Sequence, residues 1–138
     1  MKLIPIVVAA ALALTLAACG ANAEEESFKR DFNAAQEPLS KLLADGAGAS
    51  DPDRMAKIAD GLDEAATKMK ALDAPDHAKD ELATFVKEVE ASADAMREAE
   101  KAMKAKDLGK MSSILTELQE RMSAVGAAQT ALAGAVNG

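Results

Sequence analysis

From residue 28 onward, apolar residues recur at alternating steps of three and four. This spacing places them on one face of an α-helix, whereas no stretch alternates with the period of two that marks a strand. The apolar positions fall into four runs. They are Phe28, Phe32, Ala35, Leu39 and Leu42; Met55, Ile58, Leu62, Ala65, Met69 and Leu72; Leu82, Phe85, Val89, Ala93, Met96 and Met103; and Leu108, Met111, Leu115, Leu118, Met122, Val125 and Leu132. The sequence therefore predicts an all-α chain.

Residues that start and stop helices lie between the runs. Asp51 and Pro52 suit the N-cap and first position of the second helix, Pro75 suits the first position of the third, and Asp107 can cap the fourth. Glycine at position 46 suits the end of the first helix. The predicted helices span 27–45, 52–72, 75–105 and 107–134.

Short connections between these helices favour an up-down-up-down antiparallel four-helix bundle, because neighbours joined by few residues must run in opposite directions. A long two-helix coiled coil is the rival fold, but Gly46, Pro52 and Pro75 interrupt the chain too often for it. Pro38 lies inside the first run and removes one backbone hydrogen bond. We expect either a kink at Pro38 or a helix that begins only near Gln36.

The first twenty residues follow another pattern. Lys2 gives a positive start, residues 3–18 form an uncharged apolar run, and small residues precede Cys19, the only cysteine. This is the layout of a secretory signal peptide, and the run is shorter than the ~20 residues that a comfortable membrane span needs. Leu16, Ala17, Ala18 and Cys19 resemble the lipobox of bacterial lipoproteins at all positions. The resemblance implies diacylation of the Cys19 thiol, cleavage before Cys19 and usually acylation of the new amino terminus, with fatty acids such as palmitate. Two or three such chains anchor a protein stably in a membrane.

Gly20 follows the lipidated cysteine. In lipoproteins of bacteria with two membranes an Asp at this position signals retention in the inner membrane, so the resemblance implies the outer membrane, facing the periplasm, where the organism has one. The chain then divides into a signal peptide at 1–18, a lipidated N-terminus and tether at 19–27, and the bundle at 28–138.

Charge and composition narrow the classes of partner. Removal of the leader leaves 15 basic and 23 acidic side chains, a net charge of −8. This balance argues against nucleic acid and against electrostatic attachment to anionic lipid. With its one cysteine committed to lipid, and with three Phe but no Tyr or Trp, the fold must rest on an aliphatic, methionine-rich core.

Residues for catalysis or metal binding are sparse. His77 is the only histidine, whereas catalytic zinc takes about three protein ligands and di-iron bundles need paired Glu-x-x-His motifs. Serines 92, 112, 113 and 123 fall on helices without a histidine partner. We expect no enzyme, metal site or cofactor, and we interpret the carboxylates as a solvated face with i,i+4 ion pairs. Three such pairs are predicted, Glu64–Lys68, Glu100–Lys104 and Glu117–Arg121.

Haem and copper are the two cofactors to weigh. The helix pattern is loosely similar to the cytochrome b562 group, which holds haem between a Met of the first helix and a His of the last, but here neither helix supplies its ligand. Met69 and His77 form a conceivable substitute pair near one end of the bundle. The six methionines of the mature chain are candidate Cu(I) ligands, yet all lie in the apolar runs, which favours core filling.

The turn between the third and fourth helices is the candidate site for a partner. Both helices look about eight residues longer than the first two, so about 12 Å of rod would project away from the tether if the bundle is flush at its tethered end. Four lysines and one aspartate, Asp107, give this turn a patch of charge +3, which suits docking of an acidic envelope protein. In the alternative interpretation, the lysines only stabilise the negative C-terminal end of the third helix, and the apolar residues complete the core. The patch consists of Lys101, Met103, Lys104, Lys106, Leu108, Lys110 and Met111.

Two function classes follow. The first is a membrane-anchored, non-catalytic protein-interaction or structural module, like the many small helical lipoproteins of unassigned role that the chain resembles. The second is a carrier that holds a small apolar ligand or haem between its helices. The pattern gives no indication of the oligomeric state.

Overall fold

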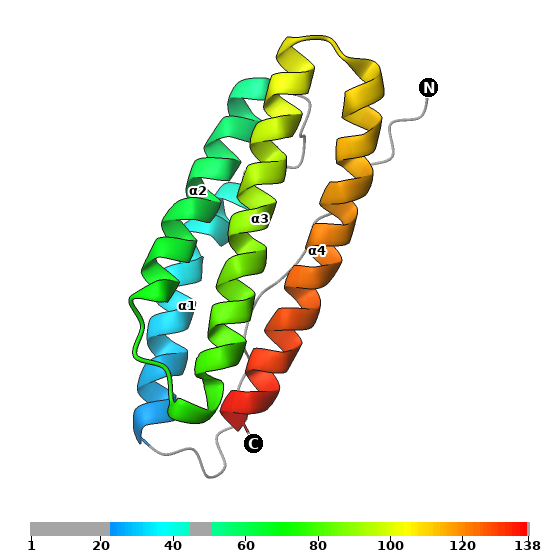
Figure 1. Cartoon of the computed structure of the whole chain (residues 1–138). Coiled ribbons are helices and arrows are strands. Elements are labelled where there is room, and N and C mark those ends of the chain that lie inside the picture. Colours follow the sequence, from blue (N-terminus) through cyan, green and yellow to red (C-terminus); the bar gives the residue numbers. More distant parts are fainter. Residues whose placement is uncertain (1–22, 45–50, 138) are drawn as a thin grey trace.

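The computed structural model describes residues 23–44 and 51–137, and all of its regular structure there is helical. The described residues form four α-helices. Figure 1 shows that they run alternately up and down and pack side by side. The predicted all-α four-helix bundle is thereby confirmed. In chain order the elements are α1 (Ala23–Ala44), α2 (Pro52–Lys70), the 3₁₀ turn η1 (Asp76–Ala78), α3 (Lys79–Lys104) and α4 (Leu108–Asn137).

The two ends of the bundle differ in what they hold. The start of α1, the segment 71–78 and the end of α4 lie together at what we call the basal end (Figure 1). The turn 105–107 between α3 and α4 lies at the opposite, distal end. The contact between His77 and Glu25, at 3.8 Å from Nε2 to Oε1, joins segment 71–78 to α1 at the basal end.

The first helix is longer than the sequence predicts. It begins at Ala23 rather than residue 27, with three glutamates in its first turn, where negative charge stabilises the positive end of the helix dipole. Residues 23–27, predicted as part of the tether, are therefore helical. The helix also continues through Pro38, so the alternative start near Gln36 is wrong. Gly46, predicted to end this helix, lies outside the described residues.

Differences of similar size occur in the last two helices. Pro75 is extended, at φ −52° and ψ 143°, and η1 follows it, so α3 begins at Lys79 rather than at residue 75. Ala78, at φ −118°, separates the 3₁₀ turn from the α-helix. Helix α4 continues to Asn137, three residues past the predicted end, where Val136 is buried in the core.

The predicted N-caps of α2 and α4 are confirmed. The Asp51 carboxylate accepts a hydrogen bond from the backbone N–H of Asp53 at 3.0 Å, at the start of α2. Asp107 does the same for α4, accepting from the N–H of Lys110 at 2.9 Å. Each carboxylate satisfies one of the backbone donors left free in the first helical turn.

The core consists of two clusters at different heights. The basal cluster draws side chains from all four helices and includes the three phenylalanines. Phe32 is its centre, because its ring contacts both Phe28, at 5.7 Å between ring centroids, and Phe85, at 5.5 Å. The distal cluster comes from α2, α3 and α4 alone; it contains Met55, Ala95, Ala99, Ala102, Ile114 and Leu118.

The prediction that α3 and α4 project past α2 at the distal end is wrong. Lys104 Nζ in the last turn of α3 lies 3.7 Å from Asp53 Oδ1 in the first turn of α2. The end of α3 is therefore level with the start of α2. Lys70 at the end of α2 donates to Glu90 at 2.5 Å. The part of α3 that precedes Glu90 therefore lies beyond α2 at the basal end, where α1 and segment 71–78 cover it (Figure 1).

Most members of the apolar runs in α2 and α3 are buried, whereas several in α4 are exposed. Met55, Met69 and Phe85 are fully covered, whereas Leu108 is 83% exposed and Met122 38%. The prediction that all methionines fill the core is therefore wrong for Met122. The side chains of Leu39 and Leu42 lie outside the described residues.

Candidate interaction surface

The distal turn brings all seven predicted docking residues to one end of the bundle. The helix α3 ends there in two backbone hydrogen bonds, from the N–H of Asp107 to the carbonyl of Ala102 and from the N–H of Lys106 to that of Met103, both 3.0 Å. This pairing is the Schellman arrangement, which needs a left-handed residue after the helix. Lys106 takes that position, at φ 55°, where glycine is the usual residue.

Glu98, one turn back on α3, neutralises two of the predicted lysines. Its carboxylate accepts hydrogen bonds from Lys101 and from Lys110, each at 2.9 Å. These two hydrogen bonds lower the pKa of Glu98 from 4.5 to about 2. Since Lys110 lies on α4, Glu98 also ties α3 to α4 just below the turn.

A third lysine is paired as well. Lys104 donates to Glu100 at 2.6 Å, and this hydrogen bond raises the pKa of Lys104. Asp53 on α2 adds a second carboxylate at 3.7 Å. Lys106 alone among the four lysines has no ion pair to a described residue. Counted with these carboxylates, the surface is nearly neutral rather than +3, because the sequence count omitted acidic groups one turn back and on α2.

The apolar members of the predicted site divide into two kinds. Met103 and Met111 are half-buried against the distal cluster. Leu108, in contrast, is the most exposed of the large apolar side chains, and Leu115 and Met122 follow it at steps of seven, 43% and 38% exposed. Sequence analysis assigned Leu115 and Met122 to the core, whereas it placed Leu108 both in the apolar run and in the docking patch. The signal it missed is the spacing of seven, which keeps them on one side of α4.

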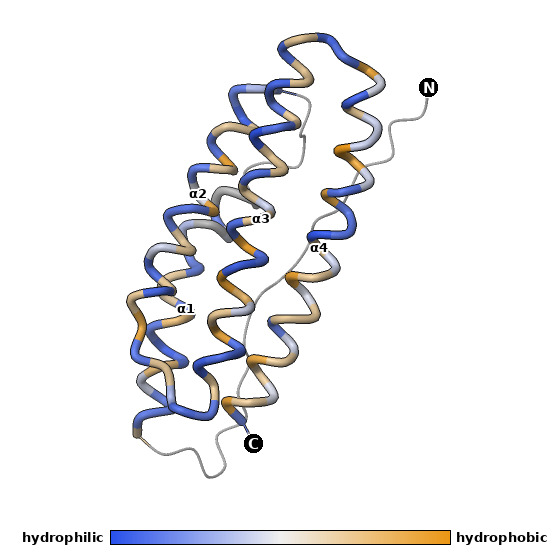
Figure 2. The backbone as a smooth tube through the Cα atoms, in the orientation of Figure 1, coloured by the Kyte–Doolittle hydropathy of each residue, from blue (hydrophilic) through white to orange (hydrophobic). Residues whose placement is uncertain are grey.

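These three residues belong to a longer surface that carries no charge. Residues at steps of three and four along a helix share one face, and we call this face of α4 the outer stripe. None of its members is charged, and six of the seven are exposed. Figure 2 shows the basal half of α4 mostly in pale to orange colours, and residues 122–137 contain no charged side chain. The outer stripe consists of Leu108, Ser112, Leu115, Gln119, Met122, Gly126 and Ala133.

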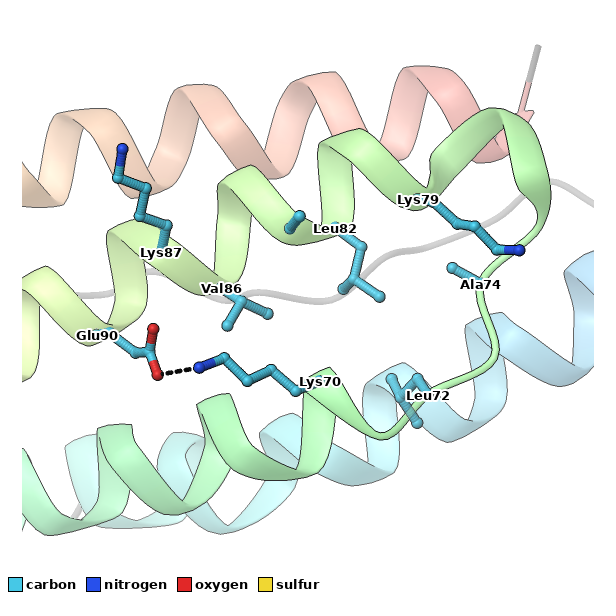
Figure 3. A pocket seen from close by; sticks show the side chains of 9 residues that line it. Lys70, Leu72, Ala74, Lys79, Leu82, Val86, Lys87 and Glu90 are labelled. Carbon is cyan, nitrogen blue, oxygen red and sulfur yellow. Dashed lines mark hydrogen bonds and ion pairs between the residues drawn. The ribbon is translucent and has the colours of Figure 1, made fainter.

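An open groove lies near the basal end, between the end of α2, segment 71–78 and the first turns of α3. It measures about 330 Å³, and its floor includes Leu72, Leu82 and Val86. Figure 3 shows Lys70 at its edge, paired with Glu90, and Lys79 and Lys87 on the α3 side. Lys79 is itself paired with Asp76 at 2.6 Å. A second open hollow of about 250 Å³ lies between α1 and segment 71–78.

Groups considered for chemistry lie apart from one another. Met69 is completely buried in the basal cluster, whereas His77 is half exposed beside Glu25. Ser92 donates its hydroxyl hydrogen to the carbonyl of Glu88 at 2.8 Å, a bond within its own helix. Within residues 23–44 and 51–137, no three or more His, Cys, Asp or Glu side chains gather as a metal site would require.

The carboxylates otherwise behave as the sequence predicts. Glu64–Lys68 at 2.7 Å, Glu100–Lys104 at 2.6 Å and Glu117–Arg121 at 3.6 Å all form. A cross-helix network that the sequence did not reveal centres on Arg97 of α3, which donates to Asp60 and Asp63 of α2. The hydrogen bond to Asp63 raises the pKa of Arg97.

Comparison with known proteins returned no match to any family model, curated protein or solved structure. Among the helices described, none combines the length and the apolar character that crossing a membrane requires.

Proposed function

We propose that this chain is an envelope lipoprotein, held in a membrane by lipid on Cys19, whose helical bundle acts as a non-catalytic protein-interaction or structural module. The lipid anchor is inferred from the resemblance of Leu16, Ala17, Ala18 and Cys19 to a lipobox. In a bacterium with two membranes, the residue after the cysteine, Gly20, favours the outer membrane and a bundle that faces the periplasm.

The position of the first helix supports this anchor. Helix α1 begins at Ala23, four residues after Cys19, so even a fully extended connection spans only about 14 Å. The basal end then lies close to the membrane, and the distal turn lies at the opposite end of the bundle (Figure 1). A short connection of this kind suits a module that holds one end of its bundle at a set height above the lipid.

Exposed apolar side chains on α4 support the interaction role. Leu108, Leu115 and Met122 remain accessible on α4, whereas Ile114, Leu118 and Leu132 of the same helix are buried in the core. Exposed apolar surface of this sort marks sites where proteins bind one another. It is therefore the outer stripe, more than the paired lysines, that supports a docking role for the distal half of the bundle.

A carrier of a small apolar ligand or haem has less support. Such a carrier needs a gap within its core, whereas the two hollows described above open at the surface near segment 71–78. The conceivable haem ligands also differ in setting, with Met69 in the core and His77 outside it. An absorption spectrum of protein made with haem available tests whether the bundle binds haem. A Soret band would support the carrier.

The anchor is tested by replacing Cys19 with serine in cells that make the whole chain. We expect the parent chain to partition into detergent and to take up labelled palmitate, and Cys19→Ser to lose both properties. Ala23→Ser, a conservative change at an exposed position outside the lipobox, serves as the matched control and should behave as the parent does. Membrane attachment that survives Cys19→Ser would refute the proposal.

A further inference from the structure

One lateral face of α4 has no described partner. Helix α4 packs chiefly against α3 and η1, and α1 packs chiefly against α2. The bundle is therefore open along α4, and the outer stripe lies beside the residues that α4 buries. The stripe extends along nearly the whole of α4, whose 30 residues make a rod of about 45 Å.

The charge pattern restricts what can cover this face. The chain as a whole has a net charge of −7, and the exposed surface of α2 carries charges such as Lys57, Asp60 and Glu64 at every turn. The outer stripe offers no charge to attract an acidic or a basic partner. A matching surface must itself be long, helical and uncharged. The outer stripe of a second copy meets this requirement, and it lets two acidic chains approach without placing like charges opposite each other.

Side-chain size along the stripe also fits a second copy. The distal half carries Leu108, Leu115 and Met122, whereas the basal half carries Gly126 and Ala133. A Cβ atom built on Gly126 would meet no other atom within 4 Å, so the backbone there is open to close approach. Two α4 helices that run parallel can approach closely near Gly126, and the larger side chains of Leu108, Leu115 and Met122 fill the space between them further along.

We infer that the outer stripe of α4 is a homotypic interface, on which α4 of a second copy docks in parallel orientation. The parallel direction rests on the proposed function, because two copies anchored by Cys19 in one membrane have their basal ends on the same side. A face about 45 Å long and about 10 Å wide covers about 450 Å² on each copy, less than a standard interface buries. The pair therefore forms through the high local concentration that anchoring in a membrane provides.

Disulfide trapping in membranes from cells that make the full chain tests this interface. In a parallel pair, each stripe position faces the same position on the other copy. Ser112→Cys, Gln119→Cys and Gly126→Cys should each give a disulfide-linked species of twice the chain mass on mild oxidation. Ser113→Cys and Ala131→Cys, which are exposed on another side of α4, are the matched controls and should stay monomeric.

A second set of variants tests the apolar contacts. In the Gln119→Cys chain, the added changes Leu115→Glu and Met122→Glu should abolish the disulfide-linked species by placing like charges across the interface. The added changes Ser113→Glu and Ala127→Glu introduce the same charge away from the stripe and should leave it intact. Helical circular dichroism of all variants should match that of the parent, since each changed side chain is exposed.

Four results would overturn the inference. They are trapping at Ser113→Cys as efficient as at Gln119→Cys, trapping at only one of the three stripe positions, a linked species that contains another protein, and trapping that survives the two glutamates. The parent chain reports separately on the proposed function. If a thiol reagent labels its Cys19, the anchor fails, whatever the stripe variants show.

Discussion

The ring of Phe32 on α1 lies 5.5 Å from the ring of Phe85 on α3, centroid to centroid, and both rings are almost wholly buried. This contact joins α1 to α3 within the basal cluster. We predict that Phe32→Ala lowers the free energy of unfolding by about 3–5 kcal/mol, because it leaves a cavity that the helices cannot close. Urea unfolding followed by circular dichroism measures the loss.

Phe32→Leu is the control for that experiment and should cost clearly less, because it retains most of the apolar contact. A loss near zero for Phe32→Ala would mean that α1 does not pack on α3 in solution.

Lys106 gives a prediction of stabilisation. Its φ of 55° places a residue with a Cβ atom in the left-handed region, at a cost of about 1–2 kcal/mol. Lys106→Gly removes this strain and should raise the urea midpoint, although glycine gives back part of the gain through the unfolded chain. Lys106→Ala removes the same charge and keeps the Cβ atom, so it should show no such rise. Equal midpoints for the two variants would contradict the left-handed turn.

Removal of the N-cap of α4 should lower the stability of the bundle. Asp107→Ala deletes the oxygen that accepts from the N–H of Lys110 and should destabilise the bundle by about 1 kcal/mol. Asp107→Asn keeps an acceptor at the same place and should retain most of the stability. Thermal unfolding of the three proteins measures the difference, and equal losses for Ala and Asn would show that the charge matters rather than the hydrogen bond.

Glu98 predicts a dependence on pH. Folding lowers the pKa of this carboxyl from 4.5 to about 2, because Lys101 and Lys110 donate hydrogen bonds to it. Its contribution to stability is therefore complete above a pH of about 4.5 and is lost as the pH falls from there towards 2. Glu98→Gln should be less stable than the parent at neutral pH, and this difference should shrink across that range. Urea midpoints measured at several pH values supply the test.

Glu120→Gln is the control for the Glu98 experiment, since Glu120 is exposed on α4 and forms no described ion pair. Its stability should follow that of the parent at every pH. A constant gap between Glu98→Gln and the parent down to pH 2 would contradict the pairing with Lys101 and Lys110.

The helices and caps could be predicted because their causes are local. Apolar spacing located α2 and α3, and the side chains of Asp51 and Asp107 marked helix starts that the structure reproduces. Local signals could not decide at Pro38 between a kink and a later helix start, because a proline in a helix that is packed elsewhere costs one hydrogen bond and does not have to end it. The i,i+4 ion pairs were predictable for the same reason as the caps.

Features that depend on neighbouring helices were not predictable. The pairing of Lys104 with Asp53 requires α2 to begin level with the end of α3, which spacing within one helix does not reveal. Likewise, the run in α4 predicted core positions for Leu115 and Met122, but burial depends on whether another helix covers that side. The net charge of the distal surface is close to zero because Glu98 and Asp53 lie beside its lysines, and the spacing within one helix does not reveal these neighbours.

The intact mass of the full chain, purified from the membranes of the cells that make it, tests the central claim most directly. The account predicts a polypeptide that begins at Cys19 and carries the added mass of two or three fatty acyl chains with their glycerol. An unmodified chain that still contains residues 1–18 would contradict it.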